Sequence, residues 1–232
     1  MGVQDKIKAV KKQISVALSI MQLDELKCRK RVLRRFGFIN DAEVVQLKAR
    51  VACEISTGDE LLLSELLFDR FFNELSPELC ASVLSCFIFE EKAECPALKE
   101  ELAKPFREVQ AKARIISKVS QESKLPLNED EYVQGFKYQL MEVVYAWAHG
   151  KSFAEIWYVG ILTQQCCDAD MHSKMTDVYE GSLIRLFRRL EELLRQMAQA
   201  AKVMGSDDLE QKFEESLKKV RRDIVAAQSL YL

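Results

Sequence analysis

The side chains with the greatest capacity for chemistry recur at intervals of three and four residues in the last quarter of the chain. They are Arg185, Arg189, Glu192, Gln196 and Gln199. At 100° per residue these positions share one side of an α-helix, and an apolar set occupies the opposite side. The apolar set is Leu183, Leu186, Phe187, Leu190, Leu193, Leu194, Met197, Ala201 and Met204. Guanidinium groups stack on nucleobases and donate forked hydrogen bonds, and a carboxylate accepts from an exocyclic amine, so the polar row suits a nucleic-acid strand.

Two simpler interpretations compete with nucleic-acid binding. In the polar row, arginine and glutamate three or four residues apart form water-facing pairs worth a few tenths of a kcal/mol each, and on the residues alone this interpretation is preferred. A second cluster, Lys27–Arg35, holds six positive charges in nine residues. It is either a solvated helix face or a set of phosphate contacts, and phosphate contacts position a strand without reading its sequence.

Catalytic motifs are not convincing in this sequence. Gly150-Lys151-Ser152 has the end of a phosphate-binding loop, but Tyr145 stands where the first glycine belongs. Asp130-Glu131 superficially resembles a DExH box, although no apolar strand precedes it to carry a magnesium-holding aspartate. We therefore expect no ATP hydrolysis by this chain alone.

Nucleophilic and metal chemistry have equally weak support. The two histidines, His149 and His172, lie in no recognisable triad motif. Cys166, Cys167 and His172 have the composition of a zinc site, but adjacent cysteines do not easily occupy two tetrahedral positions. We therefore expect no metal site.

Composition favours a mainly helical protein without membrane spans. The 232 residues include 48% hydrophobic residues, eight glycines and four prolines, and the formal net charge is −2. Such a chain can bury a sizeable core. Its near-neutral net charge does not indicate a nucleic-acid partner, so any such contact must come from local clusters of charge. Seven cysteines in apolar or helical runs read as reduced thiols of a nuclear or cytosolic protein. No run approaches the roughly 18 apolar residues of a membrane span.

Apolar spacing and helix signals predict a series of helices with one β element. Ser76 and Pro77 have the types preferred at a helix start. The alternation of Val45, Leu47, Ala49 and Val51 predicts a short strand or hairpin. The expected helices cover residues 5–18, 24–36, 61–68, a segment opened by Ser76, 97–123, 129–149, 176–204 and 206–229.

Several segments together resemble the C-terminal (DSH C-terminal) domain of the DExH-box RNA helicases that feed the nuclear exosome, including the helicase subunit of the TRAMP complex. They are Leu23–Phe38, Val51–Ser56, Leu84–Glu90, Leu140–Tyr145, Met175–Met197 and Arg221–Leu232. The resemblance implies three parts: the end of an arch or stalk helix (1–22), a partial winged helix (23–56), and a helical bundle (57–232) containing a ratchet helix at about 176–204.

The resemblance also implies roles for individual residues. Arg189 and Glu192 match the positions at which the family's ratchet helix contacts RNA bases, Arg185 and Gln196 are their neighbours, and Glu90 matches a second base contact. The implied partners are single-stranded RNA, a RecA-like helicase core in cis, and subunits of the nuclear exosome and TRAMP, with no membrane. The chain itself would hold no cofactor, because ATP and magnesium bind the RecA-like domains. The implied location is the nucleus, in the nucleolus and nucleoplasm.

Two other functional interpretations stay open. One is a free-standing helical scaffold that docks proteins without contacting RNA. The other is the cytoplasmic superkiller-type relative, which the wording of the ratchet helix disfavours. An upstream reading frame for RecA-like domains would decide against the scaffold.

Residues 157–173 depart from the family pattern, because seventeen residues stand where one cysteine is expected before Lys174. The codons of Trp157-Tyr158 must contain a GT donor, and Ser173 can supply an AG acceptor, so that excision restores a cysteine codon. We interpret the segment as a translated short intron, and a genuine surface loop is the alternative. A start at Met1 within the stalk fits an incomplete gene model.

Replacing residues 157–173 by one cysteine should leave the thermal midpoint of unfolding at or above that of the full chain, because an intron-derived segment has no evolved packing. Circular dichroism on heating both proteins measures this. A clear fall in the midpoint would instead identify an evolved, packed loop.

Overall fold

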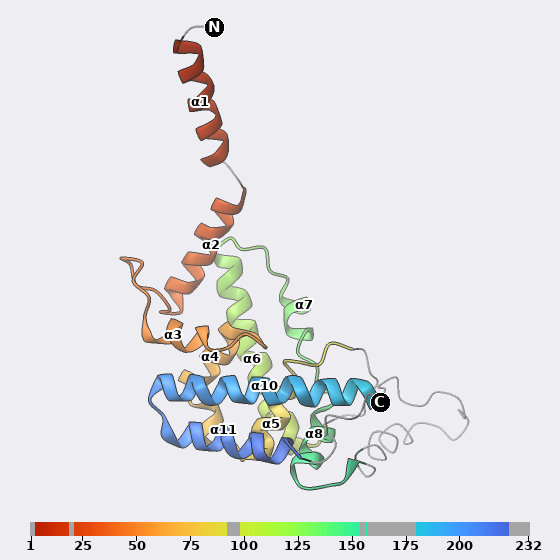
Figure 1. Cartoon of the computed structure of the whole chain (residues 1–232). Helices are drawn as coiled ribbons and strands as arrows, with labels where there is room; N and C mark the ends of the chain where they lie inside the picture. Colours follow the sequence, from red (N-terminus) through yellow and green to blue (C-terminus); the bar gives the residue numbers. More distant parts are fainter. Residues whose placement is uncertain (1–2, 19–20, 92–97, 154–155, 157–179, 223–232) are drawn as a thin grey trace, which may run out of the picture.

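The protein is an assembly of helices (Figure 1). The structure is a computed structural model, and it describes residues 3–18, 21–91, 98–153, 156 and 180–222. The helices are α1 (Val3–Leu18), α2 (Met21–Arg35), α3 (Leu47–Cys53), α4 (Glu60–Phe68), the 3₁₀ turn η1 (Phe71–Asn73), α5 (Pro77–Ser85), α6 (Glu100–Glu122), α7 (Glu129–Gln134), α8 (Met141–Ala148), α10 (Glu180–Met204) and α11 (Asp207–Val220). Within the described part, the predicted mainly helical class is therefore confirmed.

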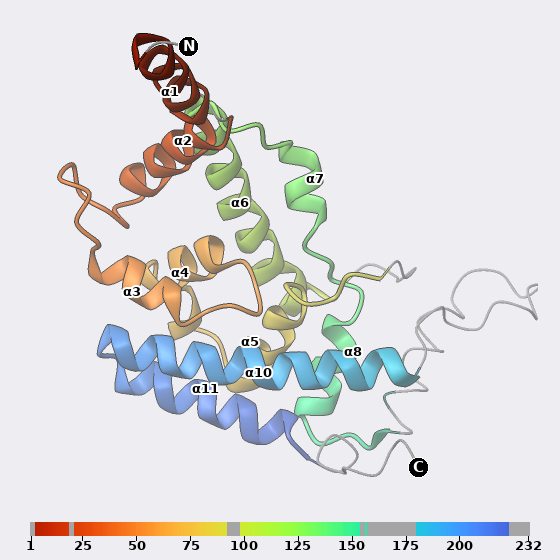
Figure 2. The ribbon, with the colours of Figure 1, turned by 45° about the horizontal axis from the view of Figure 1, so that its top comes forward.

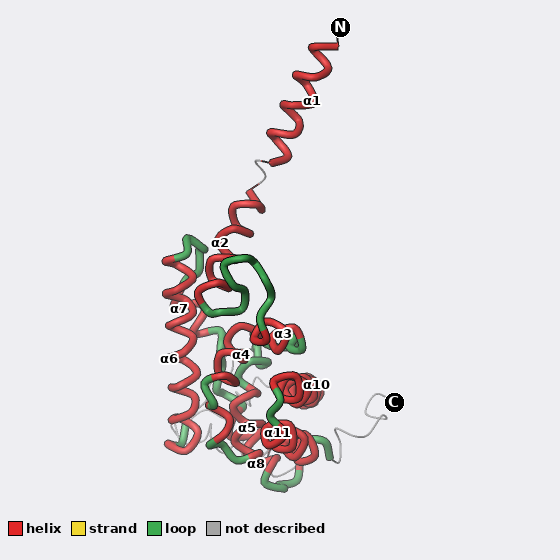
Figure 3. Tube along the Cα trace, turned by 90° about the vertical axis from the view of Figure 1, so that its left-hand side faces the viewer, coloured by secondary structure: helices red, strands yellow, loops and turns green. Residues whose placement is uncertain are grey.

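The two C-terminal helices, α10 and α11, lie side by side along one side of a bundle. They pack on α5, and α11 also packs on α8, while α3 contacts α10. Helix α6 lies on the other side of α4 and α5, as Figure 3 shows. Figure 2 shows α3 and α4 between α2 and α10. Helix α1 extends away from this assembly (Figure 1). None of the helices in the described ranges has the length and apolar composition that a bilayer crossing needs.

Helix starts and stops follow from local chemistry. The Asp59 carboxylate accepts from the main-chain N–H of Leu62 at 2.8 Å and starts α4. Ser76 caps α5 in the same way with Pro77 at its first turn, as predicted. Helix α10 ends at Met204, and the next residue, Gly205, has a φ of +80°, which favours glycine.

An aromatic stack joins α8, α10 and the segment after α11. The buried Trp147 ring lies 5.1 Å from the Phe187 ring, and its Nε1 donates to the Val220 carbonyl at 2.8 Å. The Arg222 guanidinium lies over the Trp147 ring, 3.9 Å from its centre, and donates to the Trp147 carbonyl at 2.6 Å. These contacts fix the N-terminal half of α10 against α8.

The predicted strand or hairpin at 44–51 is wrong. Leu47–Cys53 is helical, and an isolated bridge between Ile39 and Val45 is the β pairing found among the described residues. The turn between them is closed by Asn40, which accepts from the Val44 N–H at 2.9 Å. Alternation over so few residues also fits a helix face, and burial of Val51 and Ala52 on one side of a helix determined the outcome.

The predicted single helix at 129–149 is also wrong, because the chain forms α7 and α8 with a break between them. In the break, the Lys137 N–H donates to the Cys86 carbonyl at 3.2 Å, which ties this segment to the end of α5. That tertiary contact overrides the helical periodicity. The helix predicted over 206–229 is shorter than expected, because α11 ends at Val220 and residues 221–222 are not helical. The other predicted helices are present with ends shifted by a few residues; residues 176–179 and 223–229 lie outside the described ranges.

A buried carboxylate links α3, α4 and α6. Glu65 is 5% exposed and forms a salt bridge with Lys48 and a longer one, at 3.8 Å, with Lys112. Lys48 also donates to the Phe36 carbonyl at 3.1 Å and lies 5.2 Å from the centre of the Phe38 ring. Because a buried charge is costly without partners, this cluster fixes how the segment before residue 57 meets the bundle.

Lys48→Met should lower the free energy of unfolding by about 2 kcal/mol, because it leaves Glu65 buried with its more distant partner only. Urea denaturation measures the change. The matched control is Lys27→Met, which removes an exposed pair with Asp24 and should change stability by less than about 0.5 kcal/mol. Equal effects of the two substitutions would contradict a stabilising role for the buried cluster.

Candidate nucleic-acid interface

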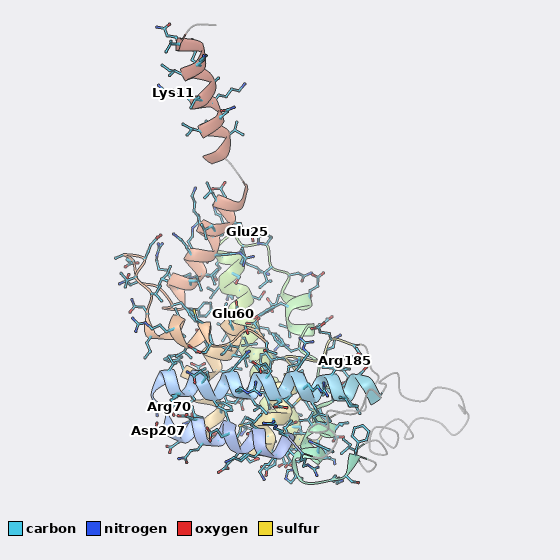
Figure 4. The ribbon with its side chains drawn as sticks, viewed as in Figure 1. Lys11, Glu25, Glu60, Arg70, Arg185 and Asp207 are labelled. Atoms are coloured by element: carbon cyan, nitrogen blue, oxygen red, sulfur yellow. The ribbon has the colours of Figure 1, made fainter. Side chains whose placement is uncertain are left out.

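Helix α10 has the two faces that its sequence predicts. The apolar positions from Leu183 to Ala201 are buried, and Met204 is partly exposed. On the opposite face the side chains of Arg185, Arg189 and Glu192 are 64%, 46% and 46% exposed. Arg185 is labelled on α10 in Figure 4, among side chains on the exposed side of the helix. The buried stripe therefore determines which way the polar row points.

Two carboxylates face two arginines of the row. Arg189 donates to Glu90 at 2.9 Å, and Arg185 approaches Glu91 at 3.4 Å and donates to the Ser182 hydroxyl at 2.9 Å. The resemblance implies Glu90 as a second base contact, and the fold brings it beside Arg189 across 99 residues of chain.

The segment that carries the two glutamates is fixed from behind. The Lys137 ammonium donates to the main-chain carbonyl of Glu90 and, at 3.0 Å, to that of Glu91. The preceding residues Ile88 and Phe89 are buried in the core. The carboxylates are thus exposed side chains on an anchored backbone.

The other end of the row is tied to the loop between α3 and α4. The Gln196 side-chain oxygen accepts from the main-chain N–H groups of Ser56 and Thr57 at 2.9 and 3.0 Å. Its nitrogen donates to the Ser56 hydroxyl at 3.0 Å and to Glu192 at 3.1 Å. Gln196 therefore has its polar atoms committed within the protein, whereas Glu192 also pairs with Arg195 on the same helix.

Close packing supports this junction. A Cβ at Gly58 would lie 3.0 Å from Leu63 Cδ1 and 3.6 Å from Leu193 Cδ1, on the buried face of α10. The absence of a side chain lets the loop approach the helix, so that Ser56 and Thr57 reach Gln196.

A shallow groove runs along the flank of the row between α10 and α11. It has a volume of about 440 Å³ and its lining includes Glu192, Gln196, Gln199 and Lys202. Most of its lining residues are polar or charged, whereas small-molecule sites are lined predominantly by hydrophobic and aromatic side chains.

The structure thus sorts the five predicted site residues. Arg189 and Glu90 form a direct pair, Arg185 and Glu192 lie on the same exposed row, and Gln196 serves as an internal link. Sequence reasoning did not identify Glu91 or the Ser56 and Thr57 N–H groups. The adjacency of Glu91 to Glu90 was a usable signal, whereas main-chain donors leave no signal in the sequence.

The basic stretch Lys27–Arg35 is not a free cluster of charge. Its six cations meet acceptors on neighbouring elements or on α2 itself. Lys27 pairs with Asp24, Arg29 with Glu25, Lys30 and Arg34 with Glu43, and Arg35 with Glu122, and Arg31 donates to the Ser123 carbonyl. The hydrogen bond from Lys30, together with its positive charge, lowers the pKa of Glu43. Compared with the row on α10, this stretch is the weaker nucleic-acid candidate.

Comparison with known proteins gives the row its context. The sequence matches the DSHCT (NUC185) domain over residues 42–228. The chain belongs to the DSHCT family. It is 57% identical over 230 residues to the "ATP-dependent RNA helicase mtr4" of Schizosaccharomyces pombe, covering 98% of this chain and 19% of that protein. It is 52% identical over 227 residues to the human "Exosome RNA helicase MTR4", covering 97% and 20%.

The chain spans about a fifth of the length of these relatives and corresponds to the C-terminal region of Mtr4 helicases. A plant relative, the "DExH-box ATP-dependent RNA helicase DExH9" of Arabidopsis thaliana, is 42% identical over 228 residues, covering 98% of this chain and 22% of that protein. The family predicted from sequence is confirmed. The division at residue 57 and the base-contact roles stay predictions.

Other candidate chemistry in the DSHCT domain has little structural support. In the described ranges no three His, Cys, Asp or Glu side chains gather as metal ligands. Cys166, Cys167, His172 and the segment 157–173 lie outside those ranges. His149 has its Nδ1 2.9 Å from the Tyr145 carbonyl, a local contact. Burial raises the pKa of Cys80 to about 12 and also raises that of Cys86, so both thiols stay protonated at neutral pH.

Gln196→Ala should lower the free energy of unfolding by about 1–2 kcal/mol, because two main-chain N–H groups lose their acceptor. The control is Gln199→Ala, the same change at an exposed position of α10, which should alter stability by less than about 0.5 kcal/mol. Chemical denaturation of both variants decides the matter. If the two glutamines prove equally dispensable, Gln196 is not the link described above.

Proposed function

We propose that this DSHCT domain guides single-stranded RNA through an ATP-dependent helicase, with α10 contacting the bases. The observation that carries the proposal is the exposed row of Arg185, Arg189 and Glu192, which the buried stripe of α10 holds outward and which Glu90 faces at 2.9 Å from Arg189. The names of the similar proteins support it, because they are RNA helicases.

The existing ion pairs do not prevent such contacts. Both partners of the Arg189–Glu90 pair are exposed, and exposed pairs contribute roughly 0–1 kcal/mol. Stacking of a base is worth roughly 1–3 kcal/mol. A base that stacks on the Arg189 guanidinium can therefore displace Glu90 from it, and the Glu90 carboxylate can then accept a hydrogen bond from an exocyclic amine.

The charge of the row favours bases over phosphates. Glu90, Glu91 and Glu192 lie beside Arg185 and Arg189, so the local field is close to neutral and does not attract a phosphate backbone. Bases are accessible in this way on single strands, where they are not paired or enclosed in a groove. The row thus suits a strand already separated from its complement.

The wider role follows from the family. We propose that the domain acts with a RecA-like core on the same polypeptide, in 3′-to-5′ unwinding for RNA processing and decay by the nuclear exosome, with TRAMP subunits as partners in the nucleus. ATP and magnesium would bind the RecA-like domains and supply the driving force for translocation. The residues of α10 would hold the strand between steps.

Arg189→Ala combined with Glu192→Ala, made in the full-length helicase, should slow duplex unwinding on the order of tenfold, because base contacts of roughly 1–3 kcal/mol are lost. Both side chains are exposed, so circular dichroism and the thermal midpoint should be unchanged. The assay is unwinding of an RNA duplex with a 3′ single-stranded overhang.

The matched control is Lys202→Ala, which removes an exposed cation near the end of the same helix, about 100° around it from Arg185. It should leave unwinding within about twofold of the parent, since an exposed charge outside the row contributes little. Normal unwinding by the double variant, with an unchanged fold, would show that the row is a solvated face and would remove the proposal's basis.

A further inference from the structure

Helix α6 has an outer face that takes no part in the role proposed for α10. Its inner face is buried against the core through the apolar side chains of Leu102, Pro105, Phe106, Val109, Ala113 and Ile116. The opposite side is exposed to solvent, and it lies across α4 and α5 from α10, as Figures 1 and 3 show.

This outer face is a basic stripe. Lys104, Arg107, Arg114 and Lys118 are all exposed and fall within about 80° of one another around the helix. Lys104 and Lys118, at the two ends, are 14 positions apart, a rise of about 21 Å. Arg107 pairs with Glu100, but among the described residues no ion pair reaches Lys104, Arg114 or Lys118. Glu108, at the edge of the stripe, is its one exposed acid between Lys104 and Lys118.

The centre of the stripe is apolar. Ile115 is 50% exposed, a large fraction for this side chain, and Ala111 is exposed one turn before it. The small methyl group of Ala111 leaves room for a partner's side chain to approach the helix and contact Ile115. Arg107, Arg114 and Lys118 surround this spot.

We propose that the outer face of α6 docks an acidic protein segment that carries one aliphatic or aromatic side chain among its carboxylates. Carboxylates spaced by one helical turn in a partner match cations spaced by 3, 7 and 4 residues on α6. The partner's apolar side chain would fill the position between Ala111 and Ile115. A phosphate backbone would use the cations but would gain nothing from Ile115, which favours a protein over RNA.

The test uses the 232-residue chain and a fluorescein-labelled peptide of about 14 residues, matching the stripe in length, with glutamates spaced by one turn around a central leucine. Fluorescence anisotropy measures its binding to the parent and to Lys104→Gln/Arg114→Gln/Lys118→Gln. Glutamine retains helix propensity. We expect binding to the triple variant to be about tenfold weaker.

The matched control is Lys8→Gln/Lys11→Gln/Lys12→Gln, which removes the same charge from exposed positions of α1 and should leave the peptide's affinity within about twofold. A second variant, Ile115→Ser, should weaken the leucine peptide severalfold and should not affect a peptide with serine in its place. Circular dichroism confirms that each variant is folded.

Three outcomes would overturn the proposal. The peptide could fail to bind the parent, or the two triple variants could lose equal affinity, which would show attraction by net charge alone. Alternatively, an oligouridylate of similar length could bind the parent, displace the peptide and lose affinity in the α6 triple variant, which would identify an RNA contact. Because α6 lies apart from α10, none of these outcomes bears on the proposed role of Arg189 and Glu192.

Discussion

Burial of one face of α10 is the constraint on which the rest of the structure depends. The stripe from Leu183 to Ala201 is the contact surface for α3, α5 and α11, and Phe187 continues it into the Trp147 stack on α8. Several fully buried leucine and phenylalanine side chains contribute roughly 1.5–3 kcal/mol each. Exposed ion pairs contribute far less, so the buried face sets the orientation of α10. The direction in which the polar row faces is a consequence of that orientation.

Polar contacts then fix the two ends of the row. At one end, Lys137 holds the backbone that carries Glu90 and Glu91. At the other end, Gln196 holds Glu192 and the loop at Ser56. Helix α10 alone would present a line of charged side chains. The bundle places the carboxylates of Glu90 and Glu91 opposite this line, so that the candidate site has charged side chains on two sides.

The sequence was sufficient to predict α10, because an apolar stripe over 25 residues leaves one helical solution. It was not sufficient at 44–51, where a short alternating pattern fits both a strand and a helix, and long-range burial of Val51 decided between them. The split between α7 and α8 depends on Lys137 meeting the Cys86 carbonyl, a contact that local periodicity does not encode.

Within the candidate site, side-chain types were predictable and their partners were not. The role of Gln196 could not be inferred from its helical position, because its partners include main-chain N–H groups 139 and 140 residues away. The family resemblance implied Arg189 and Glu90 as separate base contacts, and their pairing with each other became visible only in the structure. Residues that act through the backbone of a distant loop are the ones that sequence reading misses.

The Gln196 link has a mechanical consequence. The loop at Ser56 and Thr57 follows directly from α3, and α3 is tied through Lys48 to the buried Glu65 of α4. A force applied to the N-terminal segment is therefore transmitted along main-chain hydrogen bonds to the amide of Gln196 and from there to the carboxylate of Glu192. Such a connection works as a lever, because displacement of the segment before residue 57 changes the orientation of the Glu192 carboxylate.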